Sequence, residues 1–367
     1  MGRRESPVED VVNPWRGRKV FLTGHTGFKG GWLALWLAQK GAQVRGFALA
    51  PTTEPSLFAA ADVGGAVEDV RGDIRDFAQV RDAMIGYAPE VVFHLAAQPL
   101  VRRCYADPLG TYATNVMGTA HVLEAVRNCP SVRAVVCVAT DKCYENREWE
   151  RAYRETDPLG GHDPYSSSKA CAEMVASAYR QSFFDADGAC GGRVLLATAR
   201  AGNVIGGGDW SEDRLVPDLI KGFCAGEAVK IRRPGAVRPW QHVLEPVHGY
   251  ITLAERLLAG EKRFAGPYNF GPAEEDSWTV ERIADGLVAL WGEGAQWARD
   301  EDAGVHEAHL LRLDASKARA ELGWRPRLRI DAALAWTVGW YRAWQQGAAM
   351  RDKTLQQIAA YERLLKE

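Results

Sequence analysis

Roughly the first 200 residues alternate between short apolar runs and longer segments with helical spacing. The runs are rich in β-branched and aromatic residues, which is typical of buried strands. They occupy about residues 18–24, 42–49, 66–73, 90–97, 132–139 and 193–200. The helical segments lie between them, at about residues 28–41, 76–87, 106–128 and 165–185. Strands that alternate with helices predict right-handed crossovers and a parallel sheet.

The pattern becomes irregular after "AGNVIGGGDW", and the spacing there predicts helices near residues 214–226, 244–259, 279–291 and 331–346. No linker rich in Pro, Gly or Ser separates the two parts, so we expect them to be interleaved. The predicted fold class is α/β, with a doubly wound Rossmann domain and a smaller mixed α/β cap. The Rossmann domain is expected to comprise residues 1–203 and a returning segment at about 241–270. The cap is expected to comprise residues 204–240 and 271–367.

Composition and charge narrow the classes of partner and compartment. The 367 residues are 47% hydrophobic and 25% charged with a formal net charge of −2, which argues against a nucleic-acid or membrane partner. No apolar run approaches the roughly 20 residues of a membrane-spanning helix. The seven cysteines contain no CxxC pair, which favours reduced thiols in the cytoplasm. No metal site is expected, since His306 and His309 have no evident third ligand.

The segment "TGHTGFKG" places Gly24, Gly27 and Gly30 between the first strand and the first helix. Glycines let the backbone approach a pyrophosphate, and a helix N-terminus offers free N–H groups and a positive dipole end. This pattern therefore predicts a dinucleotide site. Asp73 ends the third strand, where its carboxylate can accept a hydrogen bond from the adenine amino group or cap the following helix.

An acidic residue that usually binds the ribose hydroxyls of NAD is missing. It is expected about 20 residues after the glycines, where this chain reads "GFALAPTT". His25 and Lys29 instead add basic groups near the phosphates. NAD is the expected cofactor, and the sequence leaves NADP open.

Tyr165 and Lys169 are spaced one helical turn apart in "YSSSK". A lysine ammonium beside a phenol favours the phenolate, so we expect the pKa of Tyr165 to be lowered toward neutrality. Such a pair can remove a hydroxyl proton while a nicotinamide takes the hydride from the same carbon.

With these features the chain resembles the extended short-chain dehydrogenase/reductase family. "HLAAQ", "TNVMGT", "RAGNVIGGGDW" and "LDASKARAELGW" are further matches, and the resemblance covers nearly the whole chain. It implies cofactor contacts from the strand ends and the glycine loop. These residues are Gly24, His25, Gly27, Phe28, Lys29, Gly30, Asp73, Ile74, Leu95, Ala96, Ala97, Tyr165 and Lys169.

The segment "TDKCY", together with "TGHTGFKG", "HLAAQPLVRRCY" and "RPWQHVLEPVHGY", most resembles one branch of that family, the sugar-nucleotide 4,6-dehydratases. Within that branch the resemblance is to the enzymes that act on CDP-glucose, which implies a role in deoxysugar biosynthesis. Thr140 stands where the family has the Ser or Thr that bonds the reacting hydroxyl. The resemblance makes Asp141 the candidate acid and Lys142 the candidate base. Asp141 must be protonated to act, so burial must raise its pKa.

The resemblance also implies a set of residues for the sugar and its diphosphate. They are Gln98, Asn115, Arg200, Asn203, Arg214, Arg238 and Trp240. Arginine suits phosphate because its guanidinium is a planar, bidentate donor. A homodimer through the helices at 106–128 and 165–185 is expected as in the family. The alternatives are another sugar-nucleotide 4,6-dehydratase, a 4-epimerase, or a non-catalytic scaffold that senses a dinucleotide.

Overall fold

The computed structural model describes residues 13–185, 188, 190–292, 294–300 and 310–367, so His306 and His309 lie outside the described residues. A seven-stranded parallel sheet is the centre of the fold, in the order β10-β6-β5-β4-β1-β2-β3. Its strands are β1 (Lys19–Thr23), β2 (Gln43–Ala48), β3 (Glu68–Arg71), β4 (Val91–His94), β5 (Ala134–Val138), β6 (Leu195–Ala201) and β10 (Pro267–Phe270). The predicted doubly wound parallel α/β sheet is confirmed.

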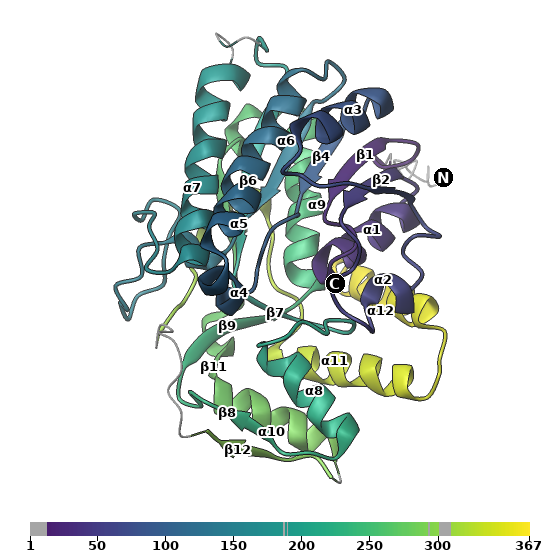
Figure 1. Cartoon of the computed structure of the whole chain (residues 1–367), viewed down its shortest axis with the longest axis vertical. Helices are drawn as coiled ribbons and strands as arrows, with labels where there is room; N and C mark the ends of the chain where they lie inside the picture. Colours follow the sequence, from purple (N-terminus) through teal and green to yellow (C-terminus); the bar gives the residue numbers. More distant parts are fainter. Residues whose placement is uncertain (1–12, 186–187, 189, 293, 301–309) are drawn as a thin grey trace, which may run out of the picture.

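Helices cover both faces of the sheet because successive strand residues point to opposite sides. In β1, Val20 and Leu22 belong to one core, whereas Phe21 between them belongs to the other. The first core packs against α1 (Phe28–Gln39), α9 (Leu244–Leu258) and α12 (Met350–Leu364). The second core packs against α3 (Phe77–Tyr87), α6 (Gly118–Arg127) and α7 (Pro164–Tyr179). Figure 1 shows the second group of helices together on one side of the strands.

A smaller unit lies beyond the carboxyl ends of the strands, in the lower part of Figure 1. It contains a three-stranded sheet in the order β11-β9-β7 and a two-stranded sheet of β12 and β8. These strands are β7 (Asn203–Ile205), β8 (Val229–Ile231), β9 (Val237–His242), β11 (Ser277–Thr279) and β12 (Trp297–Arg299). The helices are α8 (Leu215–Ala225), α10 (Val280–Trp291) and α11 (Ile330–Gln345). The division into a Rossmann domain of residues 1–203 with about 241–270, and a cap of residues 204–240 and 271–367, stays a prediction.

The helix expected at 106–128 is wrong as one continuous element. Asp107 caps a new helix by accepting a hydrogen bond from Gly110 N, and Pro108 cannot continue the preceding turn. The segment divides into α4 (Val101–Ala106), α5 (Pro108–Tyr112), the π-helical turn η1 (Ala113–Met117) and α6. The remaining short helices are α2 (Leu57–Ala60), η2 (Asp141–Cys143), η3 (Arg180–Phe184), η4 (Lys262–Phe264), η5 (Glu274–Asp276) and η6 (Ala318–Leu322). None of the helices among the described residues is both long and apolar enough to cross a bilayer.

Candidate active site

The glycines of the first turn are required by close backbone contacts. Gly24 has a φ of +80°, and a Cβ there would lie 2.7 Å from Ala96 N. A Cβ on Gly30 would lie 2.0 Å from Gly24 O. A Cβ on Gly27 would meet nothing closer than 3.4 Å, so this glycine leaves backbone open to a ligand. The loop therefore holds β1, β4 and α1 together and exposes one glycine at the N-terminus of α1.

A cavity of about 550 Å³ extends from this loop across the strand ends. Its size and lining fit a dinucleotide, whose phosphates would lie at the N-terminus of α1. The structure brings most of the predicted cofactor residues to this cavity. They are Gly24, Gly27, Phe28, Lys29, Gly30, Asp73, Ile74, Leu95, Ala96, Ala97, Tyr165 and Lys169.

His25 does not line the cavity, which corrects the expectation that its ring is a basic group near the phosphates. Its side chain is fully buried and its Nε2 lies 2.8 Å from Asp69 Oδ1. Burial lowers the pKa of His25, so the ring adds no positive charge near the phosphates at neutral pH. Asp73 lines the cavity and binds Arg75 at 2.6 Å, whereas Asp76 is the residue that caps α3.

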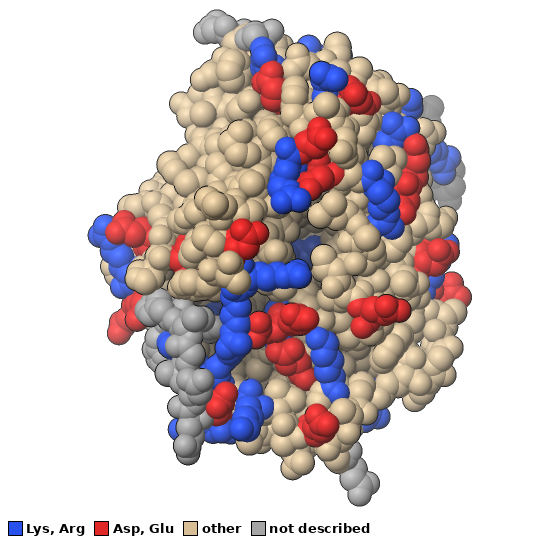
Figure 2. All heavy atoms as spheres, in the orientation of Figure 1, with Lys and Arg blue, Asp and Glu red and all other residues tan. Residues whose placement is uncertain are grey.

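A second cavity, of about 330 Å³, lies between the strand ends and the smaller unit, and Lys29, Tyr165 and Arg214 line both cavities. Burial lowers the pKa of Lys29 to about 8, with Arg214 and Lys169 adding to the effect. Lys29 therefore lies where the two cavities meet and lines both, although it was predicted to contact the cofactor alone. Figure 2 shows charged side chains gathered around the hollow between the upper and lower parts of the molecule.

The segment after β5 places an acid and an amine side by side in the second cavity. Thr140 caps the short helix η2 and donates a hydrogen bond to Asp141 Oδ1 at 2.9 Å. Asp141 is buried, and its Oδ2 has no hydrogen-bond partner among the described residues. Burial raises the pKa of Asp141, as the role of a proton donor requires. Lys142 Nζ lies 5.8 Å from the centre of the Tyr165 ring.

Tyr165 and Lys169 lie on one face of α7, but their electrostatics differ from the prediction. Burial raises the pKa of Tyr165 to about 12, against the effects of Thr140 and Arg214, so the expected lowering by Lys169 is wrong for the protein alone. Lys169 Nζ instead donates to Val138 O at 3.1 Å. Burial also lowers the pKa of Lys169.

The residues predicted to contact the substrate lie in three different places. Asn203, Arg214, Arg238 and Trp240 line the second cavity. Gln98 lines the first cavity instead. Asn115 lines neither, and this corrects its predicted substrate contact.

Asn115 fixes the loop that follows β4. Its Oδ1 accepts from Gln98 N at 2.8 Å, and its Nδ2 donates to Ser168 Oγ of α7 at 2.9 Å. Because Ser168 lies between Tyr165 and Lys169 in α7, Asn115 acts through backbone placement instead of substrate contact.

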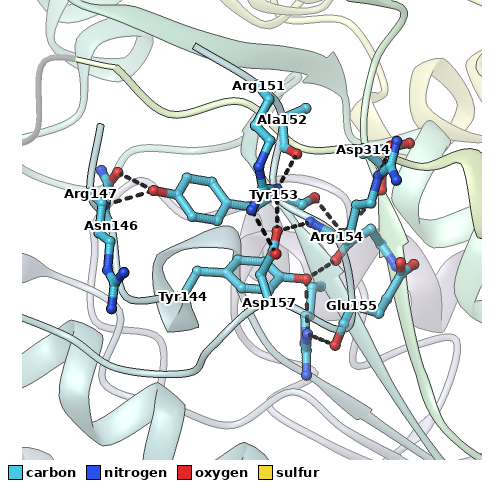
Figure 3. Close-up of polar contacts among 12 residues, drawn as sticks. Tyr144, Asn146, Arg147, Arg151, Ala152, Tyr153, Arg154, Glu155, Asp157 and Asp314 are labelled. Atoms are coloured by element: carbon cyan, nitrogen blue, oxygen red, sulfur yellow. Dashed lines mark hydrogen bonds and ion pairs between the residues drawn. The ribbon is translucent and has the colours of Figure 1, made fainter. Parts of the chain in front are cut away.

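Arg200 was predicted to contact phosphate, and the structure places it away from both cavities. Its guanidinium is buried and pairs with Glu173 at 2.8 Å. It also donates to the Tyr144 hydroxyl at 2.8 Å. Tyr144 follows the segment of Asp141 and Lys142, and its ring stacks on Tyr153 (Figure 3). Arg200 therefore ties β6, α7 and the Tyr144 segment together.

Replacing Arg200 with methionine should destabilise the fold by about 3–5 kcal/mol, because Glu173 would be left as an unpaired buried charge. The double variant Arg200→Met/Glu173→Leu should recover most of that loss. Denaturant unfolding of both variants gives the free energies. A double variant that regains stability but binds substrate much more weakly would restore the phosphate role.

Glu173 and Asp209 are site residues that were not predicted from the sequence. Glu173 lies one turn after Lys169 on α7 and forms an ion pair with Arg200. Asp209 lines both cavities and forms an ion pair with Arg214 at 2.9 Å. Asp209 lies in the segment "GGGDW", whose match to the family could have identified it. Nothing in the sequence indicates that Glu173 pairs with Arg200. No three His, Cys, Asp or Glu side chains come together as a metal site within the described ranges.

Comparisons with known proteins agree with this geometry. A curated CDP-glucose 4,6-dehydratase of Salmonella typhimurium is 51% identical over 349 residues, covering 95% of this chain and 97% of that protein. A dTDP-glucose 4,6-dehydratase of Xanthomonas campestris is 29% identical, covering 92% and 98%. The structure of a dTDP-glucose 4,6-dehydratase from Streptomyces venezuelae with NAD bound is similar at a TM-score of 0.73 and 25% identity, covering 90% and 98%. The family model described as GDP-mannose 4,6-dehydratase matches residues 21–256, and the chain belongs to this family.

Proposed function

We propose that the chain is a lyase that dehydrates CDP-glucose to CDP-4-dehydro-6-deoxyglucose with NAD as its cofactor. The observation that carries this proposal is the buried Asp141, next to Lys142, in one cavity with Thr140 and Tyr165. A reaction that only oxidises and reduces C4 has no use for an acid and an amine at this point. The 51% identity to a CDP-glucose 4,6-dehydratase supports cytosine as the nucleotide base of the substrate and glucose as its sugar.

NAD fits the first cavity through the open backbone at Gly27 and the strand ends that line it. Similar structures that contain NAD include the Streptomyces venezuelae dehydratase, which supports the choice of NAD. Bound NAD supplies the hydride acceptor for C4 and later the hydride donor for C6. The residues that would hold it are the glycine loop, Asp73, Ile74, the segment after β4, and Lys169.

The protein's own groups move the protons. Tyr165 takes the proton of the C4 hydroxyl, which Thr140 orients, and the resulting ketone acidifies the hydrogen on C5. Lys142 removes that hydrogen as a proton, while Asp141 donates a proton to the departing C6 hydroxyl. Water leaves, and once C6 has received its hydrogen, Lys142 returns its proton to C5. Tyr165 and Asp141 then exchange protons with solvent, so the sum is the loss of one H₂O with the cofactor returned to its starting state.

A direct test offers the purified protein CDP-, UDP-, dTDP- and GDP-glucose with NAD and follows the product by mass. We expect loss of one water from CDP-glucose and no net accumulation of reduced nicotinamide. Stoichiometric reduced nicotinamide would indicate a plain dehydrogenase, and an isomer of unchanged mass would indicate a 4-epimerase.

We also propose that two copies of the chain pair through α5, η1 and α7, which contact one another (Figure 1). Three large apolar side chains are exposed on these elements: Leu109 by 81%, Met117 by 51% and Met174 by 54%. Exposed apolar side chains gathered on neighbouring elements mark protein interfaces.

The seven cysteines are all free thiols, which supports a cytoplasmic location.

Met174→Lys should shift the protein from dimer to monomer, because a lysine in the apolar interface would have to be desolvated. Sedimentation velocity measures the change. Leu290→Lys is the matched control: Leu290 is 41% exposed on α10, outside the proposed interface, so its replacement should leave the dimer intact. A wild-type protein that sediments as a monomer would contradict the proposal.

A further inference from the structure

The second cavity has a catalytic end and a distant end. Tyr165 and Lys142 mark the catalytic end, where the proposed function requires the glucose ring. The distant end is formed by α8, β8 and the start of α10, and α8 contacts both of the others. Figure 1 shows these three elements in the lower part of the molecule, away from α7. A nucleotide sugar with its hexose at Tyr165 therefore has its base among α8, β8 and α10.

The distant end suits a planar ring that also needs a polar contact. Val216, Pro217, Val229, Ile231 and Val280 give it apolar walls. Arginines line the same cavity and suit the diphosphate that joins base and sugar. They are Arg102, Arg214, Arg232, Arg233 and Arg238.

Four carboxylic acids line this cavity, and their partners differ. Asp141 belongs to the catalytic segment, and Asp209 receives Arg214 at 2.9 Å. Asp213 lies between Arg102 at 3.2 Å and Arg232 at 3.8 Å. Asp218, in the first turn of α8, has Lys221 of its own helix at 4.0 Å, beyond hydrogen-bond distance. Within the described residues, Asp218 is thus a cavity carboxylate whose oxygens are not hydrogen-bonded.

We propose that Asp218 selects the base, its carboxylate accepting a hydrogen bond from the 4-amino group of cytosine. This inference rests on the proposed function for the orientation of the substrate. Cytosine carries an amino donor where uracil and thymine carry a carbonyl oxygen. An ionised carboxylate can only accept hydrogen bonds, so it repels that carbonyl oxygen. Burial raises the pKa of Asp218 to about 6, which leaves the carboxylate mostly ionised at neutral pH.

The test compares kcat/KM for CDP-glucose and UDP-glucose. The wild-type protein should prefer CDP-glucose, and Asp218→Asn should lower that preference by about 10- to 100-fold. The loss is expected because an asparagine amide can donate to the uracil oxygen as well as accept from the cytosine amine. The change should appear mainly in KM, since Asp218 is distant from the reacting carbons.

Asp213→Asn is the matched control. It removes the same charge from the same cavity, and asparagine tolerates the φ of +56° at this position, so the base preference should stay at the wild-type value. An unchanged preference in Asp218→Asn, or an equal loss in Asp213→Asn, would overturn the proposal.

Calorimetric binding of CMP and UMP separates this inference from the proposed reaction. The wild-type protein should bind CMP more tightly than UMP, and Asp218→Asn or Asp218→Ser should remove the difference. If no nucleotide-glucose is dehydrated, the proposed function fails while this comparison still decides the role of Asp218. Equal binding of CMP and UMP by the wild-type protein would reject that role without any variant.

Discussion

Replacing Tyr165 with phenylalanine is expected to lower turnover of CDP-glucose by at least about 100-fold, the usual effect of removing a general base. The variant keeps the ring that lines both cavities and loses the hydroxyl that must take the C4 proton. Binding of substrate and cofactor should stay near the wild-type values. Rapid mixing with substrate, followed by the absorbance of reduced nicotinamide, measures oxidation at C4 directly.

The raised pKa of Tyr165 makes this prediction sharper. At a pKa of about 12 the phenol is protonated at neutral pH, so the protein alone does not supply a ready base. The positive charge of Lys169, together with that of a bound nicotinamide ring, would favour the phenolate. Tyr87→Phe is the control, since the Tyr87 hydroxyl donates to Gln43 O away from both cavities. A Tyr165→Phe variant that still dehydrates at a tenth of the normal rate would assign the C4 proton to another residue.

The periodic parts of the fold were predictable because each has a local cause. Short apolar runs between helical segments identified the parallel sheet, and the glycine spacing identified the turn after β1. Gly24 and Gly30 are fixed by contacts that any Cβ would violate, so their pattern carries structural information by itself. The break between two helices at Asp107 and Pro108 could also have been predicted from the sequence, since a capping residue followed by proline starts a new helix.

Side-chain direction within a buried strand was not predictable. Every residue of β6 is buried, so its pattern does not show which face of the sheet Arg200 points to. The Glu173 carboxylate that receives Arg200 comes from α7, 27 residues earlier, and only the fold brings the two together. His25 was misplaced for the same reason, since its partner Asp69 is 44 residues away.

The direction of the pKa shift was predictable from the sequence for Asp141 and not for Tyr165. Asp141 needed burial to raise its pKa, and the end of a buried strand supplied it. For Tyr165 the sequence showed a nearby lysine but not the depth of burial, and burial is the larger effect in the structure. Spacing along a helix gives neighbours, whereas desolvation depends on every element packed around the group.

Lys142→Ala is expected to leave oxidation at C4 intact and to stop the reaction at the 4-keto sugar. In heavy water, entry of deuterium at C5 should fall by at least about 100-fold, because the base that removes the C5 proton is gone. Mass spectrometry of recovered nucleotide sugar measures the exchange. Lys230→Ala is the matched control: Lys230 lines the same cavity at its distant end, so exchange at saturating substrate should continue.

The neighbouring carboxyl decides whether Lys142 can act as that base. Burial raises the pKa of Asp141 and so favours its protonated form, and a protonated carboxyl does not stabilise an adjacent ammonium. The same protonated Asp141 is the acid that the C6 hydroxyl needs, so the two residues should titrate as a coupled pair. Asp141→Asn should therefore still exchange C5 while losing the elimination of water. Deuterium that enters C5 at the wild-type rate in Lys142→Ala would remove Lys142 as the base and leave its amine an electrostatic role beside the enolate.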